Sequence, residues 1–187
     1  PAAASSGSAA PNEWLVSDAV SVGFRPDQVR TVGSNGRYTT ITSAISAANA
    51  GDVLLIAPGF YNEEVDVNKT LSLIGLSRDD VVIRPPTLGV RLTSGSSSIG
   101  NLTIQATQHG LVNLGTAMKV VNVVAIPITS EAASYAGFVS QAESGEFIHC
   151  QAIAGTYKFG YGFRTLATSC LIQDGVSIGN DYGVYCS

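Results

Sequence analysis

Four polar side chains that could take part in chemistry recur at similar intervals in the second half of the sequence: Asn101, Asn122, His149 and Asp174. Such a column could line a ligand groove. Polar residues stacked at the turns of a solenoid, however, usually hydrogen-bond the backbone of neighbouring coils, so we predict a structural column. His149 has no second histidine at ligand spacing, and His109 precedes a glycine, so we expect no metal site and no cofactor.

The segment "TYKFGYGF" carries aromatic residues at alternate positions: Tyr157, Phe159, Tyr161 and Phe163. Alternate side chains of an extended chain point to one face, so these four rings would lie together. One interpretation is an enlarged core around Phe163. The other is an exposed binding strip of Tyr157, Phe159 and Tyr161, which would suit stacking on sugar rings or contact with a protein partner.

A glycine repeat must position both groups of residues. Each glycine of the repeat precedes an apolar residue, and the spacings begin with 21 residues (110 − 89) and 27 residues (137 − 110). Another apolar residue comes ten positions after each of the first four glycines, and the polar column follows two positions later. The repeat glycines are Gly89, Gly110, Gly137, Gly162 and Gly183. So short a unit predicts one coil of a parallel β-helix, with like residues stacked about 4.8 Å apart.

The longer repeats contain insertions, and we expect the two inserted loops to form one feature at the side of the solenoid. The first is "PITSEAASYA", which runs from Pro127 to Ala136, and the second contains the alternating aromatic residues.

The sequence before the repeat predicts a short helix followed by short strands. One apolar face is formed by Ile41, Ala44, Ile45 and Ala48, with Thr39 or Thr40 as the cap and Gly51 at the end. The predicted helix, 40–50, suits a lid on a larger apolar surface. The strands expected after it are Val53–Ile56, Val65–Val67, Leu71–Ile74 and Val81–Ile83.

Composition excludes several classes of protein. The 187 residues are 45% hydrophobic and 13% charged, with a net charge of −4, so there is no basic patch for nucleic acid. No apolar run approaches the roughly 20 residues that span a bilayer. The three cysteines, Cys150, Cys170 and Cys186, fit no metal spacing, and we expect them to be buried as small apolar residues.

The segment "TVGSNGRYTTITSAISAANAGDVLLIAPGFYNEEVDVNKTLSLIGL" resembles the opening of pectinesterase-type right-handed parallel β-helix proteins. In that family a G-x-Y/F-x-T-I segment leads into a capping helix and then into strands of the forms PG-x-Y-x-E and L-x-L-I-G. "NEWLVSDAV" and "GNLTIQAT" are similar to further segments of the family. The resemblance covers about Trp14 to Ile104, and it implies the fold more strongly than the activity.

Pectinesterase activity, as the resemblance implies it, needs two aspartates, a glutamine-lined oxyanion site and an arginine that holds the substrate carboxylate. One carboxylate attacks the ester, the other moves the proton, and the glutamines stabilise the oxyanion. In this sequence "GLVNLG" occupies the place of the family's Q-A-V strand, and neither D-F-I-F-G nor R-P-W is present. Gln173 and Asp174 match only part of a Q-D-T motif. They are the remaining catalytic candidates, and we predict that Asp174 belongs to the polar turn column instead.

These observations predict an all-β protein, a right-handed parallel β-helix with a short N-terminal capping helix. A flexible arm (1–11) and an irregular lead-in (12–30) precede the β-helix domain (31–187). We expect a non-catalytic structural or binding module in a larger surface, fibre or virion-type assembly, with protein or glycan contacts on its side loops. It would be a homo- or hetero-oligomer that is extracellular, cell-surface or virion-associated. The alternative is a divergent or fragmentary carbohydrate esterase or polysaccharide lyase.

The C-terminal coil should be incomplete. Only "VYCS" follows Gly183, whereas the period requires about 17 more residues. A solenoid that stops there would expose unpaired backbone groups and an apolar cross-section that includes Val184. We expect further residues or another subunit to cover this end.

Overall fold

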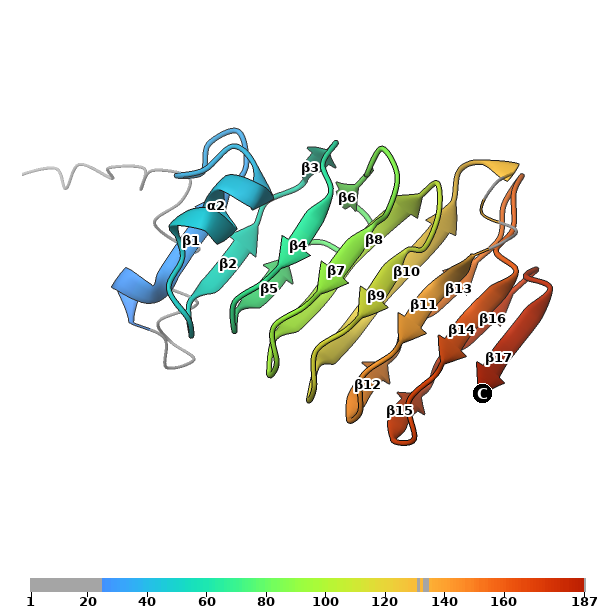
Figure 1. Cartoon of the computed structure of the whole chain (residues 1–187). Coiled ribbons are helices and arrows are strands. Elements are labelled where there is room, and N and C mark those ends of the chain that lie inside the picture. Colours follow the sequence, from blue (N-terminus) through green and yellow to red (C-terminus); the bar gives the residue numbers. More distant parts are fainter. Residues whose placement is uncertain (1–24, 131, 133–134, 187) are drawn as a thin grey trace, which may run out of the picture.

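The computed structural model describes residues 25–130, 132 and 135–186, and their regular structure is almost entirely β-strand. The strands pair in parallel and wind into a solenoid of about six turns (Figure 1). The predicted parallel β-helix is therefore confirmed. Two short helices precede most of the strands: the 3-10 helix η1 (Pro26–Gln28) and the α-helix α2 (Ile41–Ala47).

The strands form three stacks along the solenoid, and each turn of the chain adds a strand to them in order. The first stack comprises β1 (Val29–Val32), β2 (Val53–Ile56), β5 (Ser72–Gly75), the first part of β8 (Ser98–Ala106), the first part of β10 (Lys119–Pro127), β12 (Gly145–Ile148) and β15 (Cys170–Gln173). The second comprises β3 (Gly59–Tyr61), β6 (Val81–Ile83), the second parts of β8 and β10, β13 (Gln151–Ile153) and β16 (Val176–Ile178). The third comprises β4 (Val65–Val67), β7 (Val90–Leu92), β9 (Leu111–Asn113), β11 (Ala136–Ser140), β14 (Tyr161–Thr165) and β17 (Tyr182–Cys186). The first two stacks belong to one 11-stranded sheet that bends at the corner between them, and the third is a separate 6-stranded sheet.

The register of these strands follows the glycine repeat. In the third stack Leu111 pairs with both Val90 and Phe138, which are the residues after three successive repeat glycines. In the first stack Val120 pairs with both Ile99 and Phe147, ten residues after the same glycines. The predicted columns therefore exist, and the insertions of the longer repeats fall between strands.

Close approach of neighbouring coils explains the repeat glycines. A β-carbon on Gly89 would overlap the carbonyl oxygen of Gly110, and one on Gly110 would lie 2.5 Å from the carbonyl oxygen of Gly137. Only glycine lets the backbones approach so closely at this corner. Gly183, in the last coil, has no atom within 4 Å of such a β-carbon.

Single residues in the left-handed conformation turn the chain at two corners. Between the first and second stacks they are Asn101, Asn122, His149 and Asp174, with φ between 50° and 57°. Between the third and first stacks they are Ser96, Ala117 and Ser144, with φ between 55° and 59°. Asn, Asp and His are enriched in this conformation relative to other residues. Backbone geometry thus accounts for the polar column predicted from the sequence.

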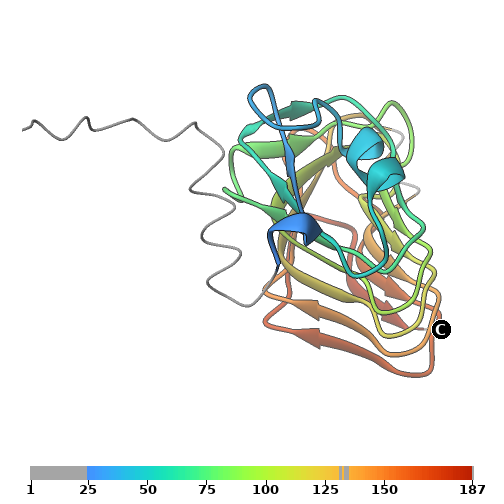
Figure 2. The same ribbon diagram turned by 90° about the vertical axis from the view of Figure 1, so that its left-hand side faces the viewer.

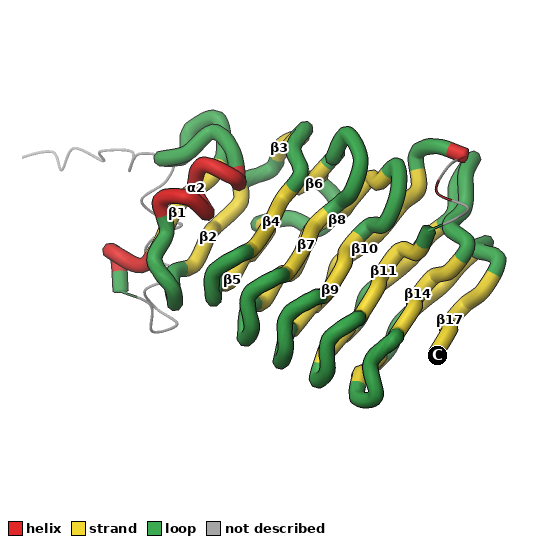
Figure 3. Tube along the Cα trace, in the orientation of Figure 1, coloured by secondary structure: helices red, strands yellow, loops and turns green. Residues whose placement is uncertain are grey.

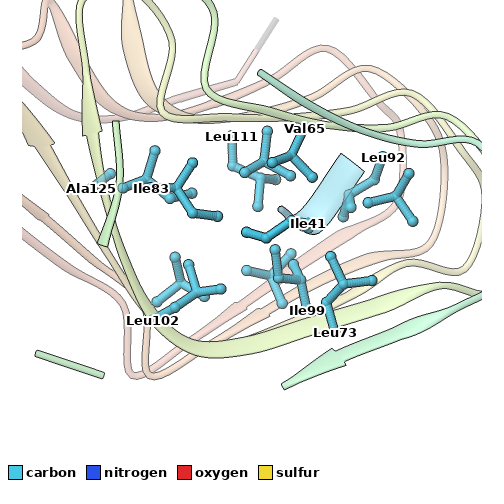
Figure 4. Packing of buried hydrophobic residues seen from close by; sticks show 14 of the residues in the cluster. Ile41, Val65, Leu73, Ile83, Leu92, Ile99, Leu102, Leu111 and Ala125 are labelled. Carbon is cyan, nitrogen blue, oxygen red and sulfur yellow. The ribbon is translucent and has the colours of Figure 1, made fainter. Parts of the chain in front are cut away.

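The core fills the inside of the coils with apolar side chains from all three stacks. Figure 4 shows the labelled residues pointing into one another: Ile41, Val65, Leu73, Ile83, Leu92, Ile99, Leu102, Leu111 and Ala125. Aromatic residues widen the stack toward the C-terminal coils, where the rings of Phe138 and Phe163 are stacked with centroids 5.0 Å apart. Burial of these side chains provides the main driving force for folding.

Helix α2 covers the N-terminal end of this core, as predicted. Thr40 caps the helix, and its Oγ1 accepts a hydrogen bond from the Ser43 amide at 3.2 Å. The side chains of Ile41, Ala44 and Ile45 are buried. Figure 2, which views the molecule from this end, shows α2 in front of the stacked coils.

Side chains on either side of β4 hold the two ends of α2. The carboxylate of Glu63 accepts hydrogen bonds from the amides of Ile41 and Thr42, both at 2.8 Å. The ammonium of Lys69 donates to the carbonyl oxygens of Ile45, Ser46 and Ala48 at 2.8–2.9 Å. An anion at the helix N-terminus and a cation at its C-terminus both stabilise the helix dipole.

The structure corrects some details of the sequence-based expectations. The helix ends at Ala47 rather than near residue 50, because the Ala48 backbone is extended. Strand β3 lies in the PG-x-Y-x-E segment, where the family resemblance implied a strand that was not among the strands expected from residue types. Of the three cysteines only Cys150 is fully buried; Cys170 is half-buried and Cys186 is exposed. The reason is that the last coil, which contains Cys186, has no described strand on its outer side.

Candidate binding surface

The structure separates the four alternating aromatic residues. Residues 154–160 lie between β13 and β14 and are not an extended strand, so alternate side chains do not share a face. Phe159 and Phe163 are buried in the main core, whereas Tyr157 is 40% exposed. Tyr161 packs on the outside of the third stack. Tyr157 and Tyr161 are thus the predicted binding residues that reach the surface, and Phe159 does not.

The described part of the first inserted loop meets the second inserted loop at one hollow. A hollow of about 400 Å³ is lined by Ser130 of the first loop and by residues 154–158 of the second. Tyr157 forms part of its wall, and Lys158 at its rim is paired with Asp181. This hollow is one place where a ligand could contact the side of the solenoid.

The N-terminal part of the polar column forms a hydrogen-bonded ladder, which supports the structural interpretation. The side-chain amide of Asn101 donates to the carbonyl oxygen of Gly75 at 2.6 Å. Asn122 donates to the Asn101 side chain at 2.9 Å, and its own oxygen lies 3.4 Å from an Arg78 nitrogen. Because these amides are occupied by one another and by the backbone, they offer few free groups to a ligand.

The C-terminal part of the column brings the catalytic candidates together at the surface. His149 Nε2 lies 3.1 Å from an Asp174 carboxylate oxygen, and both side chains are about 60% exposed. The Gln173 side-chain nitrogen lies 3.5 Å from the same oxygen. The arrangement supplies one carboxylate, one imidazole and one amide, but it has no second carboxylate for an ester mechanism of the two-aspartate kind.

The other carboxylates of the described residues are engaged elsewhere. Apart from Asp27, each has an ion-pair or hydrogen-bond partner, and none of these contacts joins two carboxylates. The ion pairs are Arg30–Asp52, Arg78–Asp79, Arg91–Asp66, Lys119–Glu146 and Lys158–Asp181. The remaining acids bind hydroxyls or backbone amides: Glu63, Glu64, Asp80 and Glu143. Among the described residues, no group of three His, Cys, Asp or Glu side chains could hold a metal ion.

An aromatic surface that was not predicted as a whole lies on the outside of the third stack, whose strands run side by side in Figure 3. We call Tyr161, Tyr182 and Tyr185 the tyrosine strip. The rings of Tyr161 and Tyr182 are stacked, with centroids 5.2 Å apart and an angle of 20° between their planes. Tyr185 lies 5.2 Å from Tyr161 at an angle of 53°. Tyr182 and Tyr185 are 59% and 40% exposed, so the strip presents ring surface to solvent.

Arg164 lies against the tyrosine strip. Its guanidinium carbon is 5.6 Å from the centroid of Tyr161 and 6.0 Å from that of Tyr185, within cation–π range. A second aromatic contact continues the surface toward the N-terminal coils, where the rings of His109 and Tyr135 meet edge to face at 4.9 Å. His109, Tyr161 and Tyr182 each directly precede a repeat glycine, so that position of the repeat carries part of this surface.

His109 is held in place by its neighbours. Its Nδ1 accepts a hydrogen bond from the Ala136 amide at 3.0 Å. Burial lowers the pKa of His109 most strongly, and the charge of Arg164 lowers it further. The imidazole is therefore neutral near pH 7, and Arg164 is the positive charge of this surface.

A shallow apolar groove of about 300 Å³ lies on the outside of the first stack. It is centred on Gly100, which has no side chain to fill the space between Ile74 and Val121. Lys119 and Asn122 lie at its edges. This groove is the most apolar of the surface hollows described here, but it has no cluster of ionisable groups.

Comparison with solved structures shows that the fold resembles that of pectin methylesterases. One match is a pectin methylesterase in complex with a hexasaccharide, with a TM-score of 0.58 and 17% identity over 83% of this chain and 69% of that chain. Pectin methylesterase from Erwinia chrysanthemi matches with a TM-score of 0.56, the same identity and the same coverage. No family model matches the sequence, and no curated protein sequence matches it significantly. At this level of identity the comparison confirms the fold-level resemblance that the sequence indicated.

No helix in the described part of the chain is both long enough and apolar enough to cross a membrane.

Proposed function

We propose that this protein is a carbohydrate-binding β-helix module that does not itself hydrolyse esters. The observation that supports this proposal most directly is the engagement of the carboxylates. Hydrolysis by two aspartates needs a nucleophile and a proton donor that face the same bond. The His149–Asp174 contact joins an imidazole to a carboxylate at the surface, and it contains a single carboxylate.

The fold and the outer surface support carbohydrate as the ligand class. Proteins with this fold include a pectin methylesterase whose structure contains a hexasaccharide. A solenoid repeats its outer side chains about every 4.8 Å, which suits a linear polymer with repeating units. Exposed tyrosines, which stack well on the apolar faces of sugar rings, are present at Tyr157 and in the tyrosine strip.

Pectin supplies the test, because binding and hydrolysis can be measured on the same polymer. We expect the protein to be retained in affinity electrophoresis through pectin while releasing no methanol from it. Release of methanol at an enzymatic rate would overturn the non-catalytic proposal, and absence of binding to every plant or microbial polysaccharide tested would overturn the carbohydrate proposal.

A carbohydrate esterase is the second candidate, and the Gln173–Asp174–His149 cluster is the observation that favours it. The side chains of His149 and Gln173 both approach the same Asp174 oxygen. If the cluster is catalytic, Asp174→Asn should abolish methanol release. Asp79→Asn is a matched control, because Asp79 is an exposed acid paired with Arg78 beyond the cluster.

We also propose that the module acts outside the cell, or on a cell or virion surface, as part of a larger assembly. Among the described residues, large apolar side chains are exposed on the last coil, including Leu171, Ile178 and Val184, and further residues of the chain or another subunit would cover them. Light scattering tests this point. A mass corresponding to the 19.3 kDa monomer at all concentrations would contradict self-association.

A further inference from the structure

Three apolar side chains on the outside of the first stack are buried. Val29, Val53 and Leu55 alternate with inward residues, so they point away from the core, yet they form a buried cluster. Val53 is 1% exposed and Leu55 is 7% exposed, whereas Ile74, which pairs in register with Leu55 in the next coil, is 38% exposed. An outward side chain is buried only where other atoms lie over it, so the outer face of β1 and β2 has a cover.

The described residues supply part of this cover. The loop after β1 covers Thr31, whose hydroxyl accepts a hydrogen bond from the Arg37 amide at 3.0 Å. Within residues 25–130, 132 and 135–186, Leu76 is the apolar side chain that packs against the buried cluster from outside it. One half-buried leucine at the edge is too small to cover three side chains, which leaves most of the cover to another part of the chain.

The sequence just before the described residues has the pattern of such a cover. Residues 14–24 read "WLVSDAVSVGF", and apart from Asp18 every second residue is a large apolar one: Trp14, Val16, Val20, Val22 and Phe24. The positions between them are largely small or polar. In an extended conformation this segment would have one apolar face, and that face needs an apolar surface to pack on.

The segment joins the described chain beside the buried cluster. Arg25 is four residues before Val29 (29 − 25 = 4). Eleven residues separate Trp14 from Arg25 (25 − 14 = 11), which is up to roughly 36 Å of extended chain. Successive coils are only about 4.8 Å apart. The segment can therefore reach from β1 across β2 and β5, which lie side by side in Figure 1, to the coil of β8.

The apolar groove at Gly100 continues the same outer face. Gly100 pairs in register with Ile74, one coil beyond the end of the buried cluster. Its volume of about 300 Å³ is at the lower limit of ligand pockets, and its walls are almost entirely apolar. The groove has the size and chemistry to receive one aromatic side chain.

We propose that residues 14–24 form an extended strap that packs on the outer face of the first stack. The Phe24 end lies on Val29 and Val53, and the Trp14 ring lies against Ile74 in the Gly100 groove. Burial of the two aromatic rings supplies most of the favourable free energy. The strap protects the outside of the first coils as α2 protects their core, and it closes the groove to other ligands. This inference is independent of carbohydrate binding.

The strap belongs to the same chain rather than to a second copy. Val53 is already buried in the single chain, and the covalent link through Arg25 keeps the segment at a high effective concentration beside this face.

Tryptophan fluorescence of the whole chain tests the proposal, because Trp14 is the single tryptophan of the sequence. We expect its emission to be shifted to the blue of that of N-acetyltryptophanamide, and its quenching by acrylamide to be about threefold weaker. Neither value should change when the protein is diluted.

Substitutions on the face locate the contact. Ile74→Glu would place a charge under the Trp14 ring, and we expect acrylamide quenching to rise to nearly that of N-acetyltryptophanamide while the circular dichroism of the β-helix is kept. Ile178→Glu is the matched control, because Ile178 is also an exposed isoleucine but lies in the second stack. Ile74→Ala, which adds no charge, should raise the quenching by a smaller amount, and it provides the measurement if the glutamate variant fails to fold.

The outcomes separate three possibilities. Quenching of wild-type Trp14 equal to that of N-acetyltryptophanamide would overturn the strap. A protected Trp14 that responds to neither Ile74 variant would place the segment elsewhere and overturn the contact proposed here. Protection that is lost on dilution would mean docking on a second copy and would overturn the intramolecular strap. Protection that the Ile74 variants reduce and Ile178→Glu does not would support it.

Discussion

The two ends of the β-helix are built from the same repeat but have different surroundings. Val65 and Val184 are the first and last members of one inward column of the third stack. Val65 is buried near α2, whereas Val184 is 56% exposed because no described residue lies beyond it. The comparison shows that the repeat specifies which way a side chain points, and that a cover on the open side determines whether it is buried.

The N-terminal end also concentrates polar contacts that stabilise its cover. Glu63 and Lys69 bind the two ends of α2, and Arg30 forms an ion pair with Asp52 at 2.8 Å in a nearly buried position. At the C-terminal end, in contrast, the exposed residues are largely aromatic and aliphatic. Among the described residues, polar contacts that hold a covering helix lie at the first end, and exposed apolar side chains lie at the second.

Introducing a carboxylate at each end of the β-helix should give the largest difference in unfolding free energy. Ile45→Asp would place a carboxylate in the buried contact between α2 and the core, and we expect a loss of about 4 kcal/mol in unfolding free energy. For the monomer of 187 residues, Val184→Asp should change it by less than about 0.5 kcal/mol, because the side chain is exposed in the single chain. Urea denaturation measures both. A large loss for Val184→Asp would show that this end is covered in solution, as the sequence-based expectation requires.

Substitution of a repeat glycine should also have different effects on stability inside the solenoid and in its last coil. Gly89→Ala would place a methyl group against the Gly110 backbone, and we expect it to cost about 2–3 kcal/mol. Gly183→Ala meets no atom and should raise stability by about 0.5 kcal/mol, because it restricts the unfolded chain. Thermal denaturation of the two variants is the measurement, and equal effects would contradict the close packing of coils at this corner.

The buried thiol of Cys150 and the exposed thiol of Cys186 should differ in how they make the unfolding free energy depend on pH. Burial raises the pKa of Cys150 from its ordinary value of 9.0 to about 11. The unfolded chain therefore ionises first, so stability is fully present below pH 9 and falls by about 2–3 kcal/mol as the pH rises to 11. Cys150→Val should remove this part of the pH dependence in urea denaturation at pH 8 and pH 11. Cys186→Val, at the exposed end, should leave it unchanged.

The lysine at the end of α2 should give a smaller effect. Lys69→Met keeps the apolar stem but removes the ammonium that contacts three carbonyl oxygens, and we expect a loss of about 1–2 kcal/mol. Lys119→Met is the control, since the Lys119–Glu146 pair is exposed and separated by 3.6 Å. Its loss should be below about 0.5 kcal/mol. Similar losses for the two variants would mean that Lys69 does not hold the helix.

Sequence periodicity was sufficient to predict most of the fold because a solenoid reuses local rules in every coil. The spacing of the repeat glycines gave the register of Leu111 and Val120 with their neighbours, since glycine is required where two backbones approach. Periodicity also indicated the buried face of α2. Periodicity alone did not indicate β3, which is three residues long, and the strand was implied only by the family resemblance.

The candidate site followed less directly from sequence. Alternation suggested that Tyr157, Phe159 and Tyr161 share a face, but the chain between β13 and β14 is not extended and buries Phe159. The tyrosine strip joins residues from β14 and β17 that are 21 positions apart, a distance that only the coil register closes.

The sequence by itself thus determined the coil period, the inward columns and the capping helix, because each depends on residue type at a fixed spacing. The tertiary structure alone decided which outward residues meet and which charges are neutralised. Arg91 and Arg164 occupy equivalent positions, yet only Arg91 has an acid in the adjacent strand. The difference arises because the charge state of a surface depends on neighbours from other coils, whereas the direction of a side chain depends on its own strand.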